Sequence, residues 1–144
     1  MIFSQTAEYA LRAVVALASK TDQPWTNQQL AATTKVPSNY LSKLMQSLRR
    51  AEIIHAQRGV GGGFRLQRRA DEITVLDVIR VVEPVQRIHQ CPLGLEAHRH
   101  ELCSMHRQLD DALASTECVL SNTTIQQLLD DQSAAVPLDV KVCV

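Results

Sequence analysis

Aromatic residues are scarce in this chain of 144 residues, which has two phenylalanines, two tyrosines and one tryptophan. Because 45% of the residues are nevertheless apolar, we expect a core built mainly from leucine, valine, isoleucine and alanine. No apolar run reaches the roughly 18 to 20 residues that a membrane-spanning helix needs. The N-terminus also lacks a basic segment followed by an apolar one, which argues against a signal peptide. We therefore expect a cytoplasmic protein of ordinary domain size, with no membrane partner.

Patterns typical of enzymes are also missing. No catalytic triad or pair of acids stands out, and the acidic residues of the second half are spread along predicted helices. The glycines at 59–63 are not followed by a helix or by Gly-Lys-Ser/Thr, so they do not fit a nucleotide-binding loop. The cysteines do not form the Cys-x-x-Cys pair of small redox enzymes. We therefore expect that the protein is not an enzyme.

Neither sign of charge prevails overall, but the two halves of the chain differ strongly. Residues 1–70 contain 10 basic and 3 acidic residues, whereas residues 71–144 contain 5 basic and 12 acidic residues. A basic first half predicts contact with a polyanion, and the alternative is a solvated surface with uneven charge.

Helical periodicity covers the start of the chain. Residues 4–20 form a predicted helix capped by Ser4, and a short helix follows at 27–33. After a tight connection, Ser38 caps a third predicted helix over 39–51. This helix is apolar on one face, and the opposite face carries Asn39, Ser42, Lys43, Arg49 and Arg50. A short helix, a turn and a second helix form the helix-turn-helix pattern, whose second helix enters the major groove of DNA.

A predicted β-hairpin follows the third helix. Residues 53–57 and 64–66 have the pattern of short strands, and a glycine-rich turn joins them. Arg58 and Arg65 supply positive charge, so the hairpin is typical of the wing of a winged helix. The alternative is a winged helix used only for protein contacts, and it would be favoured if no salt-sensitive DNA binding occurred.

The second half begins with a predicted helix over 74–83, ended by Pro84. Residues 85–104 have weak periodicity, and a long helix is predicted from about 105 to 131. Its apolar stripe consists of Leu109, Leu113, Leu120, Ile125, Leu128 and Leu129. We expect this stripe to pack against the same helix of a second subunit. The alternative is one amphipathic helix folded onto its own domain.

These observations predict a mainly α fold, a winged helix-turn-helix with a long C-terminal dimerisation helix. The expected division is a DNA-binding region at 1–83, a Cys/His sensor loop at 84–106, the dimerisation helix at 107–132 and a flexible tail at 133–144.

Several segments in this order resemble the IscR/NsrR-type (BadM/Rrf) family of winged-helix transcription regulators. They are Glu8-Tyr9-Ala10-Leu11-Arg12-Ala13, Pro37-Ser38-Asn39-Tyr40-Leu41-Ser42-Lys43-Leu44, Arg58-Gly59-Val60-Gly61-Gly62-Gly63-Phe64-Arg65-Leu66, Asp77-Val78-Ile79 and a cysteine-bearing loop. The resemblance covers about residues 1–130. It implies a homodimer on palindromic DNA, with the third helix in the major groove and the wing at the minor groove. The DNA-binding residues that it implies are Ser38, Asn39, Tyr40, Ser42, Lys43 and Arg58.

Cysteine and histidine are concentrated in the predicted loop. Of four cysteines and five histidines in the chain, two cysteines and three histidines lie within residues 91–106. Structural disulfides are disfavoured in a reducing cytoplasm, so this cluster predicts metal binding or redox chemistry. We expect Cys118 to pack among apolar residues, and Cys143 in the tail to be incidental.

The resemblance makes the prediction for this loop more specific. Cluster-binding relatives carry three loop cysteines; Cys91 matches the first and Cys103 the third, but the middle one is missing near His98. A four-iron cluster on three loop cysteines therefore cannot form. Two cysteines with two other ligands can hold a [2Fe–2S] cluster or tetrahedral zinc. The candidate ligands are Cys91, Cys103, His106, His98, His100 and, from the resemblance alone and across the dimer, Glu8.

We therefore predict a homodimeric transcription regulator, a repressor, whose DNA affinity depends on an iron–sulfur cluster or on redox state. Zinc binding and metal-free thiol sensing stay open as alternatives, and so does a loop without any chemistry. The family resemblance implies nitric oxide, oxidants or iron shortage as signals.

Overall fold

The computed structural model describes residues 3–133, 135 and 137–139, and Cys143 with most of the predicted flexible tail lies outside them. The fold is mainly helical with one two-stranded antiparallel sheet, as predicted. None of the described helices combines the length and the hydropathy needed to cross a membrane. The elements are α1 (Gln5–Ser19), α2 (Asn27–Thr34), α3 (Ser38–Arg50), β1 (Ile54–Gln57), β2 (Gly63–Leu66), α4 (Val75–Val82), η1 (Glu96–His98), α5 (Ser104–Ser121), α6 (Ile125–Asp130) and η2 (Pro137–Asp139).

Short polar side chains set where the first helices begin. The Ser4 hydroxyl accepts the Ala7 amide at 3.1 Å and caps α1 as predicted. Thr26 caps α2 in a reciprocal pair with Gln29. The prediction that Ser38 caps α3 is wrong: Ser38 is already helical, and Pro37 precedes it without a side-chain cap. Proline suits this place because its fixed φ and missing N–H cost nothing before a first helical turn.

The core lies between α1, α3, α4 and α6, and it is aliphatic as expected. Helix α3 buries Leu41, Leu44, Met45 and Leu48, which belong to the same core cluster as the buried alanines and valines of α1. Small residues on α1 let the neighbouring backbones approach closely, so the body of the domain is compact around that helix. Trp25 is the one aromatic side chain among the buried core residues that the structure describes.

Trp25 connects the wing to the helical body. Its amide donates to the Phe64 carbonyl at 2.9 Å, and the Phe64 amide donates to the Trp25 carbonyl at 2.7 Å. Its indole Nε1–H donates to the Lys20 carbonyl at 3.0 Å. Trp25 thus pairs with the free edge of β2. The two residues are 39 positions apart, so a local sequence pattern does not predict this contact.

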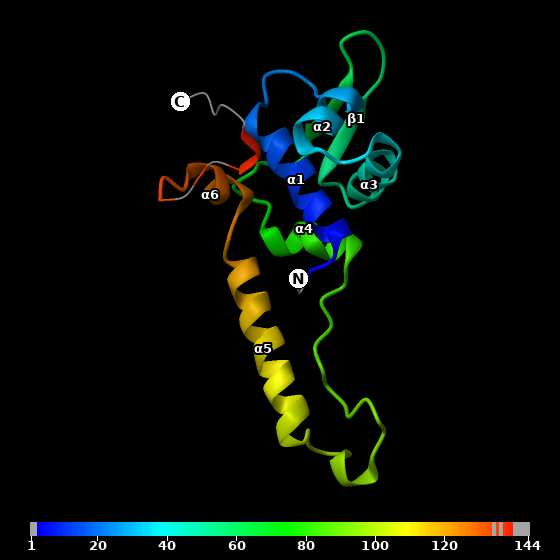
Figure 1. The fold of residues 1–144 in the computed structure, drawn as a ribbon, viewed down its shortest axis with the longest axis vertical. Coiled ribbons are helices and arrows are strands. Elements are labelled where there is room, and N and C mark those ends of the chain that lie inside the picture. Colours follow the sequence, from blue (N-terminus) through cyan, green and yellow to red (C-terminus); the bar gives the residue numbers. More distant parts are fainter. Residues whose placement is uncertain (1–2, 134, 136, 140–144) are drawn as a thin grey trace.

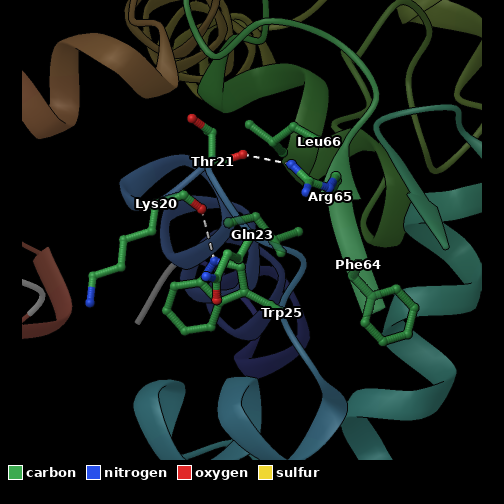
Figure 2. Close-up of a pocket in the computed structure, with 8 residues that line it drawn as sticks. Lys20, Thr21, Gln23, Trp25, Phe64, Arg65 and Leu66 are labelled. Carbon is green, nitrogen blue, oxygen red and sulfur yellow. Dashed lines mark hydrogen bonds between the residues drawn. The ribbon is translucent and has the colours of Figure 1, made fainter. Parts of the chain in front are cut away.

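Arg65 has a structural role that differs from the expected one. Its guanidinium donates to the carbonyls of Thr21 and Asp22 at 2.7 and 3.3 Å. Figure 2 shows Arg65 beside a small pocket that Trp25 and Phe64 also line. Arg65 therefore anchors the base of the wing to the α1–α2 connection, and Arg58 is left as the arginine of the turn.

An arm projects from this body. Residues 83–103 run away from α4 to a tip near η1, and the chain returns along α5 (Figure 1). We call residues 83–103 together with α5 the arm. The tip of the arm and the tip of the wing lie at opposite ends of the molecule (Figure 1).

The predicted single helix over 105–131 is wrong, because the chain breaks it after Ser121. Thr124 starts α6 with a capping box to Gln127. A residue of α4 also stabilises this break, since the Val75 amide donates to the Thr123 carbonyl at 2.9 Å. Helix α6 belongs to the body: Ile125 and Leu129, expected in a dimer stripe, are buried in the core.

Candidate DNA-contacting surface and sensor loop

Helix α3 presents one broad polar face to solvent. At about 100° of rotation per residue, Asn39, Lys43, Gln46 and Arg50 fall within a strip about 60° wide, opposite the buried leucines. All four are exposed. We call these four residues the central strip. The other predicted DNA contacts on α3 lie outside the strip, with Ser42 next to it and Ser38 and Tyr40 further round, at the two edges of the exposed face.

Some of the predicted contact residues already have partners within the chain. The Tyr40 hydroxyl hydrogen-bonds to the Thr6 hydroxyl, and its ring meets Tyr9 edge-on at 5.5 Å. The Asn39 Oδ1 accepts the Tyr40 amide at 2.9 Å. Tyr40, with 38% of its surface exposed, therefore braces α3 against α1 as well as bordering the polar face.

The remaining predicted contacts include one engaged hydroxyl and two free charges. Ser42 donates to the Ser38 carbonyl at 3.1 Å. The side chains of Lys43 and Arg58 are exposed, and within residues 3–133 they enter no hydrogen bond or ion pair. Because these two charged side chains have no partner within the described chain, they can bind DNA phosphates without first breaking another contact.

Glu8, the predicted ligand outside the loop, lies in the first turn of α1. Its carboxylate pairs with Arg12 at 2.5 Å. Arg12 also donates to the Thr34 carbonyl at the end of α2, at 3.1 Å, and stacks over the Tyr9 ring. The predicted ligand Glu8 is therefore linked through Arg12 to the helix-turn-helix.

The arm brings each loop cysteine next to one histidine. The Cys103 Sγ lies 3.5 Å from the Nδ1 of His106, which is itself buried. Cys91 lies in a hollow that Gly94, His98 and Arg99 also line. The Leu95 amide and then His98 stabilise the Cys91 thiolate, which lowers the pKa of Cys91 to about 7. The His98 Nδ1 is buried and has no hydrogen-bond partner among the described residues.

We expect Cys91 of the metal-free protein to be alkylated by iodoacetamide with a midpoint near pH 7, because the thiolate is the nucleophile. Replacing His98 by alanine removes one of the groups that stabilise this thiolate and should move the midpoint upward. Mass spectrometry of the Cys91 peptide across pH checks both values. A wild-type midpoint at or above that of a free cysteine, about 8.5, would contradict the assigned environment.

A polar clamp fixes the base of the arm. The Arg87 guanidinium donates through Nε and Nη2 to the two carboxylate oxygens of Asp110, each at 2.7 Å. The Ile88 amide adds a third bond to Asp110 at 2.8 Å. Arg87 and then Ile88 lower the pKa of Asp110 to about 2. A carboxylate with a lowered pKa stabilises the fold above its usual pKa, so this clamp weakens only as the pH falls toward 2.

The predicted ligands do not all meet within one chain. No group of three or more metal-binding side chains lies together in the part of the chain that the structure describes. Glu8 belongs to the body, whereas both Cys–His pairs lie on the arm. His100 is exposed near the tip. The prediction that Cys118 packs among apolar residues is wrong, since Cys118 is exposed on α5.

Comparison with known proteins identifies the family. The Rrf2 family, described as an iron-dependent transcriptional regulator, matches residues 3–131. The chain belongs to the Rrf2 family. It is 30% identical over 140 residues to the HTH-type transcriptional regulator NsrR of Geobacillus kaustophilus, and the match covers 93% of each chain.

Solved structures of similar regulators have the same fold. The global cysteine regulator CymR of B. subtilis has 29% identity and a TM-score of 0.74, covering 89% of this chain and 95% of CymR. T. potens IscR has 25% identity and a TM-score of 0.77, covering 94% and 93%. The winged-helix prediction is therefore confirmed, and this Rrf2 protein is a DNA-binding transcription regulator rather than an enzyme.

Sequence reasoning missed three features of this Rrf2 protein that bear on function. Gln46 was absent from the predicted polar face, although its spacing from Asn39 and Ser42 places it there. The Arg87–Asp110 clamp joins residues 23 positions apart and has no local signal. The pairing of Trp25 with β2 was also missed, although a single large aromatic residue in an otherwise aliphatic chain was a sign of a special packing position.

Proposed function

We propose that this protein is a homodimeric repressor acting on palindromic DNA in the cytoplasm, and that a [2Fe–2S] cluster at the arm controls its DNA affinity. The observation that carries this proposal is the pairing of Cys91 with His98 and of Cys103 with His106 on one projecting arm. Two thiolates and two imidazoles are a known donor set for a [2Fe–2S] cluster. The family description as iron-dependent supports the choice of iron.

The residues present fit such a group in their chemistry. The buried, unpartnered His98 Nδ1 is a polar atom that a bound group would satisfy. Cys91, Cys103, His98 and His106 would hold the cluster, with Glu8 of the partner subunit as a further candidate ligand. A bound cluster would supply a reversible one-electron change. Because the two pairs do not form one group within the chain, the arm has to close, or a partner has to contribute.

The dimer is proposed from an unpartnered face of α5. Its apolar and small residues recur with steps of four, three, four and three positions, and they are Met105, Leu109, Ala112, Thr116 and Val119. Met105, Leu109 and Val119 are 58%, 51% and 64% exposed. Alternating steps of three and four are the spacing with which two helices pack along a common seam. A second copy of α5 is the partner that this face fits.

Contacts within one subunit link the arm to the recognition helix. The Glu83 carboxylate, at the start of the arm, accepts the amide and hydroxyl of Ser4 at 3.1 and 3.0 Å. Two residues further along α1, Thr6 binds Tyr40 on α3. A change in the arm therefore acts on the first turn of α1, and through it on α3. We propose that arm closure alters the angle between the two recognition helices, whose spacing must match about one turn of DNA.

A metal analysis of anaerobically purified protein tests this function. Wild type should show visible absorption bands with matched iron and sulfide, and Cys91→Ser should lose both. Cys118→Ser, which removes an exposed cysteine outside the Cys–His pairs, should keep them and serves as the matched control. Zinc in place of iron would establish the zinc alternative, and a colourless protein free of both metals would refute both metal proposals.

The lowered pKa of Cys91 favours one second candidate, a metal-free thiol sensor. In that case the colourless protein should lose or gain operator affinity on treatment with peroxide, and dithiothreitol should reverse the change. Cys91→Ser should be insensitive to both treatments. A wild-type protein that responds to neither metal nor peroxide would exclude this candidate.

A further inference from the structure

Gln46 lies in the middle of the polar face of α3 and has no partner of its own. It is exposed, and its side-chain amide enters no hydrogen bond among residues 3–133. Asn39, on the same line of the helix, already uses its Oδ1 on the Tyr40 amide. Of the two side-chain amides in the central strip, Gln46 is therefore the one with both its donor and its acceptor free.

The chemistry of a free glutamine amide in a major groove points to one base. Its carbonyl and NH₂ group match the N6 amino group and the N7 of adenine as a bidentate pair. Lys43 precedes and Arg50 follows Gln46 within the central strip, and we expect their charges to attract the DNA backbone to this face of α3. We propose that Gln46 is a specificity-determining residue that reads adenine in the major groove.

The position of Gln46 along α3 sets which base pair it reads. Seven residues separate it from Asn39, which at 1.5 Å per residue is about 10 Å along the helix axis. Base pairs are stacked about 3.4 Å apart, so the two side chains address base pairs about three steps apart. The contribution of Gln46 is thus separable from that of Asn39 in every half-site.

Selection of binding sites from a randomised DNA duplex tests this role. Full-length wild type and Gln46→Ala are compared, each both metal-free and as purified anaerobically. Gln46→Ala should lose the adenine preference at one base pair of each half-site and bind the wild-type operator about 5- to 150-fold more weakly. Gln46→Glu should replace the preference for adenine by one for cytosine, whose amino group a carboxylate accepts.

Two matched variants separate base reading from general contact. Asn39→Ala should change the preference at a different base pair and leave the Gln46 position intact. Arg49→Ala, on the flank of the strip, should weaken binding to all sequences alike and reduce the salt slope by about one. The proposal is overturned if Gln46→Ala weakens all sequences alike, or selects the same sites as wild type, or if Gln46→Glu still selects adenine. Thermal unfolding confirms that each surface variant is folded.

Discussion

Replacing Gly63 by alanine is expected to lower the free energy of unfolding by about 3 kcal/mol. A Cβ at this position would lie 2.4 Å from the Trp25 carbonyl oxygen and 2.7 Å from its carbonyl carbon. Both are backbone atoms that cannot rotate away. The φ of +151° at Gly63 adds strain for any residue with a side chain. Relief of the clash would break the two hydrogen bonds between Trp25 and Phe64, so the wing would separate from the body.

The matched control is Gly61→Ala, two residues away in the same turn. Gly61 also has a positive φ, +75°, but a Cβ there would meet no atom within 4 Å. Its cost should be the conformational strain alone, about 1 kcal/mol. Urea unfolding followed by circular dichroism and by Trp25 fluorescence measures both variants. If the two variants were destabilised equally, the contact with Trp25 would not be what demands glycine.

Placing a carboxylate on the α5 face, with Leu109→Glu, is expected to weaken the proposed dimer about 100-fold or more. In a two-fold interface the same patch serves both subunits. A single substitution therefore buries two unpaired negative charges. Because each half-site then has to be bound independently, operator affinity should fall with the dimer. Analytical ultracentrifugation over a concentration series measures the dissociation constant directly.

Cys118→Glu adds the same charge to an exposed position on the opposite side of α5 from the apolar face. It should leave the dissociation constant within about threefold of wild type, as surface substitutions generally do. Retention of a wild-type dimer by Leu109→Glu would show that α5 pairs through another face. A wild-type protein that is monomeric at all concentrations would refute the dimer itself.

Local patterns predicted most of the body correctly, because its helices obey local rules. The apolar spacing of α1, α3 and α4 follows the helical repeat. Thr26 and Thr74 each start a helix by accepting the amide three residues on. The break before α6 also had a local sign, since Thr124 and Gln127 form a capping box. The apolar residues before and after the break continue one helical stripe, so their spacing alone predicted an unbroken helix.

The candidate sites were predictable only in part. The cysteines and histidines of the arm stood out by composition, but their division into Cys91 with His98 and Cys103 with His106 depends on how the arm folds. Exposure of α3 residues followed from the helical repeat, whereas the engagement of Tyr40 by Thr6 joins residues 34 positions apart. Contacts of this kind arise from tertiary packing, which a single sequence does not display.

Helix α6 has a consequence for how the protein is made. It closes the core with Ile125 and Leu129, and its start is tied by backbone hydrogen bonds to residues 73 and 75. The DNA-binding body is therefore discontinuous in sequence, with the whole arm inserted between its two parts. A nascent chain that has emerged only as far as α4 lacks part of its core, and a truncated fragment ending there lacks it permanently. On the ribosome, the arm must be translated before the body that binds DNA can close.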